Sequence, residues 1–317
     1  MRIVSNLGDL AAGPQGAVLA IGNFDGMHLG HQAVIEGALA VAHRLGTGLS
    51  VLTFEPHPRR YFRPGDPPFC LTSVARKAEI LEEVGAERLI ALPFDEAMAS
   101  MTAPAFVSDI VVGALRASHV VIGYDFAFGH KRAGDAESLR RMGGEAGFGV
   151  TVIEPAAPDA GEAYSSGRIR EHLRGGRPAE AARLLGRWWR FEAVVGRGDA
   201  RGTELGFPTA NLALGETIEP AHGIYAVRAG LGNEAGPRDA VASLGTRPTF
   251  DGTDVILEVH ILDFAGALYG KTLRVDFIAY LRPEEKFASI DALKAQMATD
   301  CAGARQALAA STGAKPA

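Results

Sequence analysis

Two histidines three residues apart, His28 and His31, are the first side chains in this chain that could do chemistry. The apolar run 18–21 precedes them and apolar residues at helical spacing follow, so they lie where a strand turns into a helix. The free backbone N–H groups and the dipole at a helix start attract phosphate. Two imidazoles facing one phosphate suit adenylyl transfer, in which prearranged donors stabilise charge at the α-phosphorus of ATP.

Other interpretations of this turn stay open from sequence alone. Gly22, Gly26 and Gly30 let a backbone approach a ligand closely, but their spacing matches neither the dinucleotide fingerprint nor the Walker A pattern. A glycine-rich turn can be purely structural. The two histidines could also hold zinc, although helical zinc pairs are usually four residues apart and need a third ligand. Phosphate chemistry fits the pattern best.

Two further polar side chains stand in loops that follow predicted strands. The loop 54–58 contains two prolines and projects His57, which an ordinary structural loop would also explain. The loop 123–129 places Asp125 between aromatic residues, and the alternative is an Asx-turn in a hydrophobic plug. Both are candidate ligand-binding residues if the strands are parallel.

A second phosphate-binding pattern begins the helix predicted to run to about residue 173. Ser165, Ser166 and Arg168 supply hydroxyls and a guanidinium beside free backbone donors, which suits a triphosphate. A serine N-cap followed by a solvated arginine face would give the same pattern, so these residues alone do not decide between the two.

The stretch 198–212 is the most informative part of the second half. Its glycines, Gly206 among them, permit close passage over phosphates. Thr209 and Asn211 face the same way in an extended segment, because side chains alternate along a strand. Their oxygens, with waters and ATP phosphates, would satisfy Mg²⁺. A long structural hairpin loop is the alternative.

The elements that must position the first group of residues alternate between short β-rich runs and amphipathic helices. The predicted strands are 18–21, 49–54, 88–92, 119–123 and 150–153, and the predicted helices are roughly 31–45, 73–84, 104–116 and 135–146. This alternation predicts a doubly wound parallel sheet, so the fold class of this half is α/β. Ligands bind such sheets at the carboxyl ends of the strands, where the candidate loops lie.

Beyond Gly186 the hydrophobic period changes from helical to two. The runs expected as strands are 189–195, 224–229, 240–244, 256–262 and 273–281, with turn clusters between them. Many short strands joined by turns predict an antiparallel β-barrel, and the pattern at 290–297 predicts one closing helix. The predicted domains are therefore 1–186 and 187–317.

Composition excludes several classes of protein. A length of 317 residues favours two domains with separate cores. The net charge of −5 and a pI of about 6.0 provide no basic field for a nucleic acid. No apolar run is long enough to cross a bilayer, and the first residues do not form a signal peptide. Cys70 and Cys301 are not spaced as a metal site or a redox motif would be, so we expect a cytoplasmic protein. A homo-oligomer is possible from the sequence.

The run from Gly22 to His31 resembles the His-x-Gly-His nucleotidyltransferase superfamily, and specifically the FAD synthetase module of bacterial bifunctional riboflavin kinase/FAD synthetases. The second half resembles riboflavin kinases through its Pro-Thr-Ala-Asn sequence at 208–211. The runs 223–225, 245–250, 258–264, 268–270 and 282–287 follow in the family's order. The resemblance extends from about residue 16 to 300.

This resemblance implies a role for each candidate residue. In the first module it implies catalysis by His28 and His31, flavin binding by His57 and Asp125, and ATP binding by Gly22, Asn23, Phe24, Gly30, Ser165, Ser166 and Arg168. In the second it implies ATP binding by Gly206, Thr209 and Asn211, Mg²⁺ held by Thr209 and Asn211, and a general base at Glu258. Without the resemblance, Glu258 would be an outward, solvated strand residue.

The implied function is phosphorylation of riboflavin by ATP to FMN, followed by adenylylation of FMN to FAD with release of pyrophosphate. Riboflavin, FMN and ATP are then the partners. Three residues depart from the family pattern: Gly167 replaces a threonine, Trp188 a proline and Thr203 an arginine. Gly167 leaves open a monofunctional riboflavin kinase with a decayed first module, and a flavin-binding regulator is the other alternative.

Overall fold

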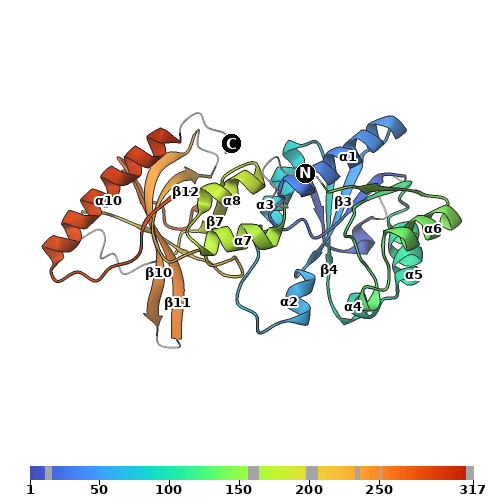
Figure 1. Cartoon of the computed structure of the whole chain (residues 1–317), viewed down its shortest axis with the longest axis horizontal. Helices are drawn as coiled ribbons and strands as arrows, with labels where there is room; N and C mark the ends of the chain where they lie inside the picture. The colour runs from blue at the N-terminus through green and yellow to red at the C-terminus, as the bar shows by residue number, and fades with distance from the viewer. Residues whose placement is uncertain (11–15, 156–163, 198–205, 233–235, 250–251, 312–317) are drawn as a thin grey trace. The chain divides into compact units, whose positions relative to one another are not determined.

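The computed structural model describes residues 1–10, 16–155, 164–197, 206–232, 236–249 and 252–311. The chain forms two compact units, which Figure 1 shows in one view. Unit 1 comprises Met1–Pro67 and Thr72–Tyr164, and unit 2 comprises Pro68–Leu71 and Ser165–Ala317. The functional boundary near Gly186 stays a prediction.

Unit 1 contains the predicted parallel sheet. Its six strands lie in the order β1-β4-β3-β2-β5-β6, and every pair is parallel. Their bounds are β1 (Arg2–Val4), β2 (Val18–Ile21), β3 (Leu49–Glu55), β4 (Arg88–Pro93), β5 (His119–Gly123) and β6 (Gly149–Ile153). The chain steps from β2 to β3 and β4 on one side and then crosses to β5 on the other. The order therefore reverses beside β2, and ligands bind such sheets at this point.

Helices follow the strands of unit 1, as the sequence predicts. They are α1 (Leu29–Leu45), α2 (Pro58–Phe62), α3 (Val74–Glu83), α4 (Glu96–Ser100), α5 (Ala103–Ala105) and α6 (Ala136–Ala146), with short 3₁₀ turns at Leu7–Leu10 and His130–Arg132. The helix predicted at 104–116 differs from an ordinary α-helix. It begins as α5 and continues as a π-helix, Phe106–Ala114.

Both faces of the parallel sheet are packed. Alternate strand residues such as Ala20 and Val121 face α1, while Leu19 and Val120 pack with the π-helix residue Phe106. Since side chains point to opposite faces in turn, burial on both faces requires nearly continuous apolar strands. These are the short apolar runs that the sequence shows.

Unit 2 is a nearly closed antiparallel barrel. Its strands lie in the order β7-β12-β9-β10-β11-β8, and every pair is antiparallel. A bridge between Gly196 and Asn211 links the ends of this series. The strands are β7 (Trp189–Val194), β8 (Ala210–Ala213), β9 (Gly223–Leu231), β10 (Arg238–Thr249), β11 (Gly252–Ile261) and β12 (Thr272–Arg282), and α7 (Ser166–Arg174) and α8 (Pro178–Leu185) precede them.

The predicted closing helix is α10 (Ile290–Ala310), which lies along the barrel in Figure 1. Ser289 caps it by accepting a hydrogen bond from the backbone N–H of Ala292 at 3.1 Å. Arg282, the last residue of β12, makes a bidentate pair with Asp300 of α10 at 2.8 and 2.7 Å. Hydrogen bonding to this carboxylate raises the pKa of the Arg282 guanidinium. The pair fixes the helix to the end of β12.

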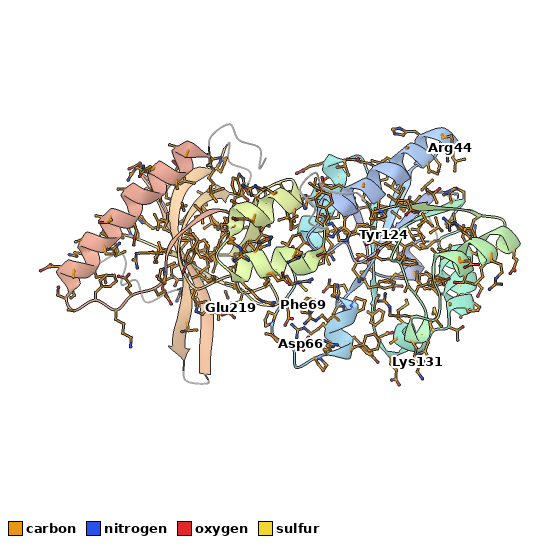
Figure 2. The ribbon with its side chains drawn as sticks, in the orientation of Figure 1. Arg44, Asp66, Phe69, Tyr124, Lys131 and Glu219 are labelled. Carbon is orange, nitrogen blue, oxygen red and sulfur yellow. The ribbon has the colours of Figure 1, made fainter. Side chains whose placement is uncertain are left out.

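A short segment from the first half of the chain, Pro68–Leu71, belongs to unit 2. The backbone N–H of Ile218 donates to the carbonyl of Cys70 at 2.9 Å. The indole of Trp189 donates to the carbonyl of Leu71 at 3.0 Å. Phe69, labelled in Figure 2, is fully buried. The sequence contains no signal for this assignment.

No helix within the described residues has the length and hydropathy needed to span a bilayer.

Candidate active sites

The turn between β2 and α1 has an unusual backbone. Phe24, Gly26 and Met27 all have positive φ, at 48°, 87° and 48°. Left-handed conformations are routine for glycine but cost roughly 1–2 kcal/mol for other residues. Burial of the Phe24 and Met27 side chains in the core of unit 1 stabilises this conformation. The turn therefore delivers His28 to the start of α1 in one orientation.

His28 is the N-cap of α1, and its Nδ1 accepts a hydrogen bond from the backbone N–H of His31 at 3.2 Å. Because Nδ1 accepts, the neutral ring carries its proton on Nε2, which can donate to a ligand. The two imidazoles stack with ring centroids 3.6 Å apart, and Phe24 meets His31 edge-on at 5.4 Å. The two predicted histidines thus lie together at the sheet's reversal point.

Gly30 has a steric reason to be glycine. A Cβ at this position would lie 3.2 Å from two atoms of the His28 ring and 3.3 Å from Cβ of Tyr164. Gly22 is similar, because its Cβ would lie 3.0 Å from the ring of Phe24. The glycines predicted to admit a ligand therefore also leave room for the rings of His28 and Phe24.

His57 and Asp125 occupy the carboxyl ends of β3 and β5, the two neighbours of β2. His57 is the N-cap of α2, and its Nδ1 accepts from the N–H of Arg59 at 3.1 Å. Asp125 is exposed. Arg59 also pairs with Asp66 at 2.7 Å, and Figure 2 shows Asp66 beside α2. His57 thus has a structural role in a braced loop, while its role toward flavin stays a prediction.

An aromatic cluster at the same edge of the sheet escaped the sequence analysis. Tyr61 and Phe62 of α2 pack edge-on against Phe94, which follows β4, with centroids 5.6 and 5.7 Å apart. Phe62 is 63% exposed and Tyr61 37% exposed. Exposed aromatic side chains grouped beside a ligand site can stack on a flat ring. The signal was present in part, because Phe94 directly follows one predicted strand and Tyr61 and Phe62 follow the neighbouring strand within seven residues.

Ser165, Ser166 and Arg168 begin α7, as predicted. The Ser165 Oγ caps the helix by accepting from the N–H of Arg168 at 3.2 Å. The Arg168 guanidinium donates to Glu171 at 3.2 Å, and both side chains are exposed. All of these residues fall in unit 2, whereas His28 and His31 fall in unit 1, so their grouping around one triphosphate stays a prediction.

The barrel brings Thr209, Asn211 and Glu258 together. Asn211 of β8 stands directly opposite Glu258 of β11, and the Thr209 hydroxyl donates to the Glu258 carboxylate at 3.4 Å. The alternating residues Ala210 and Val259 are buried in the barrel. The three polar side chains therefore share the other face of the β8–β11 pair.

The segment leading into β8 is held by His260, for which no role was predicted from the sequence. His260 Nδ1 donates to the carbonyl of Pro208 at 2.8 Å, and its ring meets Phe207 edge-on at 5.5 Å. Gly206 has φ of 88°, which favours glycine. Residues 198–205 of the predicted phosphate loop, including Thr203, lie outside the described residues.

The donor types at the barrel site are oxygens, which suit Mg²⁺ better than zinc. Across the described parts of the chain, no three His, Cys, Asp or Glu side chains are grouped as a metal site would need. His28 and His31 thus have no third zinc ligand of these types in that part of the chain.

Comparison with known proteins connects these sites to a family. The family model for FAD synthetase matches residues 11–168, and the model for riboflavin kinase matches residues 185–308. The bifunctional riboflavin kinase/FMN adenylyltransferase of Escherichia coli (strain K12) is 39% identical over 308 residues, which cover 96% of this chain and 97% of the relative. The chain belongs to this bifunctional family.

Other relatives agree with this assignment. The bifunctional riboflavin kinase/FMN adenylyltransferase of Pseudomonas fluorescens is 40% identical over 98% of each chain. A solved structure titled as a macrolide-efflux protein from Streptococcus pneumoniae matches with a TM-score of 0.84 and 33% identity, covering 96% of this chain and 98% of that one. The resemblance stated from the motifs is therefore confirmed, as is the two-part fold.

Proposed function

We propose that this chain phosphorylates riboflavin with ATP to give FMN, and then transfers AMP from a second ATP to FMN to give FAD and pyrophosphate. Both family models match in order, and relatives that match over nearly their whole length are named for both activities. The observation that carries the proposal is that each half has its own group of polar side chains of types that can bind phosphate or Mg²⁺. Paired imidazoles lie at the sheet's reversal point in unit 1, and a Thr-Asn-Glu group lies on the barrel.

In adenylyl transfer, a phosphate oxygen of FMN attacks the α-phosphorus of ATP, and pyrophosphate leaves. His28 and His31 donate to the oxygens on which charge develops, without a covalent intermediate. Gly22, Asn23, Phe24 and Gly30 line the nucleotide, and the start of α7 with Ser165, Ser166 and Arg168 binds the triphosphate. The N-cap geometry of His28 supports its part, because it leaves Nε2 as the donor.

In the kinase reaction, Glu258 takes the proton from the terminal ribityl hydroxyl as that oxygen attacks the γ-phosphorus of ATP. We assign Gly206 to the binding of ATP. The hydroxyl of Thr209 and the amide oxygen of Asn211 are suited to hold Mg²⁺ with ATP phosphates. The cation would neutralise phosphate charge when bound. The shared face of β8 and β11 supports this grouping.

We assign the flavin of the adenylylation reaction to the sheet edge that carries His57, Asp125 and the aromatic cluster of Tyr61, Phe62 and Phe94. Phe62→Ala should raise the KM for FMN about 3- to 10-fold, because one ring-stacking contact is worth roughly 0.5–1.5 kcal/mol. Steady-state FAD formation at varied FMN measures this. Tyr269→Ala, which removes an exposed aromatic side chain from unit 2, should leave that KM unchanged. Equal effects of the two variants would remove the cluster from the site.

Gly30→Ala should lower FMN adenylylation about tenfold, since the new methyl group forces the His28 ring or Tyr164 to move by a few tenths of an ångström. Gly144→Ala is the matched control, because a Cβ at that position in α6 meets open space. The readout is the rate of FAD formation from supplied FMN. A Gly30 variant as active as the Gly144 variant would contradict the steric account.

The function itself is tested by incubating the purified chain with riboflavin, ATP and Mg²⁺ and separating the flavins over time. FMN should appear first and FAD should follow. FMN without FAD would instead favour the kinase with a decayed first module. Bound but unchanged flavin would favour the regulator.

We place this chemistry in the cytoplasm. Cys70 and Cys301 are free cysteines, and unpaired cysteines are typical of a reducing compartment. The chain's partners are the small molecules named above. A measurement of the protein's mass in solution would show whether it forms a homo-oligomer.

A further inference from the structure

A buried carboxylate lies next to the paired histidines, and no role proposed above uses it. Asp25 is only 2% exposed. Its Oδ1 accepts hydrogen bonds from both the backbone N–H and the hydroxyl of Thr72, at 3.1 and 3.3 Å. The Thr72 hydroxyl in turn accepts from the backbone N–H of Gly26 at 2.6 Å. Thr72 therefore bridges the carboxylate of Asp25 and the amide that follows it.

The backbone held by this bridge is the left-handed turn. Phe24, Gly26 and Met27 have positive φ on either side of Asp25, and two of the three are not glycine. A bulky residue leaves this conformation when nothing fixes it. The hydrogen bond from Gly26 ties the centre of the turn to Thr72, which directly precedes Ser73, the N-cap of α3. The turn is thus anchored to the residue that precedes the N-cap of α3.

The residue after this turn is His28. Its imidazole must be oriented so that Nδ1 caps α1 and the ring stacks on His31 at 3.6 Å. A change in the backbone of Gly26 or Met27 would rotate or shift the His28 Cα–Cβ bond. Displacement of a catalytic group by about 1 Å can cost up to about 10²-fold in rate.

We propose that Asp25 and Thr72 are positioning residues for adenylyl transfer, which hold the left-handed turn so that the imidazoles of His28 and His31 face the reacting phosphate. This inference rests on the proposed function. Neither residue needs to touch substrate, because the Asp25 carboxylate is buried and acts through the backbone that precedes His28. Thr53 adds a second tie, since its hydroxyl donates to the carbonyl of Asn23 at 3.1 Å.

The decisive variant is Thr72→Val, which keeps the shape of the side chain and removes the hydroxyl. We expect kcat for FMN adenylylation to fall about tenfold, while the KM for ATP changes less than about threefold. The reason is that misplaced donors weaken binding of the transition state more than binding of the ground state. Thr72→Ser should restore kcat to within about twofold of the parent chain. Thr151→Val is the matched control, because it removes a half-buried threonine hydroxyl that pairs with His119.

Riboflavin phosphorylation by the same preparations reports on the integrity of unit 2 and should not change, while the Thr72→Ser and Thr151→Val variants report on unit 1. Asp25→Asn is the second variant. It keeps an acceptor oxygen but loses the charge, so its kcat should lie between those of the parent and Thr72→Val.

A parent-like kcat in Thr72→Val would overturn the proposal. So would failure of Thr72→Ser to restore the rate, or an equal loss in Thr151→Val. If Thr72→Val does not fold, Asp25→Asn with a parent-like kcat overturns the proposal in its place. A parent chain that makes FMN but no FAD would refute the proposed adenylylation itself, which is a separate result.

Discussion

FAD formation from supplied FMN is expected to fall by about 10²–10³-fold in His28→Ala, while riboflavin phosphorylation stays at the parent rate. The loss corresponds to removal of one preorganised donor to the transition state. It arises because Nδ1 of His28 is occupied by the N–H of His31, which leaves Nε2 as the donor. The two activities are compared in the same preparation by separating riboflavin, FMN and FAD over time.

The control for this variant must distinguish loss of the hydrogen-bond donor from loss of the N-cap of α1. His28 caps α1, and loss of a cap costs about 1 kcal/mol of stability. Asparagine is among the best N-cap residues, so His28→Asn keeps the cap and removes the imidazole. We expect it to be as slow as His28→Ala. A His28→Asn chain with near-parent adenylylation would show that capping, and not donation, was lost, and an equal loss of both activities would contradict separate sites.

The fold of unit 1 could be predicted because its signals are local. Runs such as 49–54 and 119–123 are mostly apolar over a strand's length, and their alternation with amphipathic helices leaves few arrangements other than a parallel sheet. The predicted ligand edge then follows from the chain direction. Sequence could not reveal the left-handed backbone at Phe24 and Met27, because those residue types do not favour it and burial stabilises it.

Long-range assignments were the least accessible. Pro68–Leu71 belongs to unit 2 through hydrogen bonds with Trp189 and Ile218, more than a hundred residues away. The aromatic cluster likewise joins α2 to Phe94 across two strands. Such contacts depend on which strands become neighbours, and the strand order of a sheet cannot be deduced from any short stretch of sequence.

The barrel site shows a third limit, which is strand register. A period of two predicts that Thr209 and Asn211 share a face, and Glu258 was named only through the family resemblance. The structure adds that Asn211 stands opposite Glu258, with Ser243 of β10 opposite Glu258 on the other side. A one-residue slip of β11 would turn Glu258 to the barrel interior. The position of Ser243 beside Glu258 could not be predicted either, because it depends on this register.

FMN formation should fall by about 10²–10⁴-fold in Glu258→Gln, the usual scale for loss of a general base. Glutamine keeps the length of the side chain and an oxygen that can accept from the Thr209 hydroxyl, but it cannot take up the ribityl proton. Adenylylation of supplied FMN should be unchanged, because it uses the residues of the other site.

Glu192→Gln is the matched control for this experiment. Glu192 also lies on a barrel strand, but it pairs with Arg274 on the neighbouring strand at 3.0 Å and has no proposed role in the kinase site. Glu192 and Arg274 form a half-buried pair away from the proposed catalytic residues, so loss of the charge should leave the kinase rate near that of the parent chain. A Glu258→Gln chain that retains the parent rate of FMN formation would show that Glu258 is not the base. Equal losses of kinase rate in the two variants would show that any loss of charge on these strands impairs the barrel. The grouping of Thr209, Asn211 and Glu258 would then give no support to a catalytic role for Glu258.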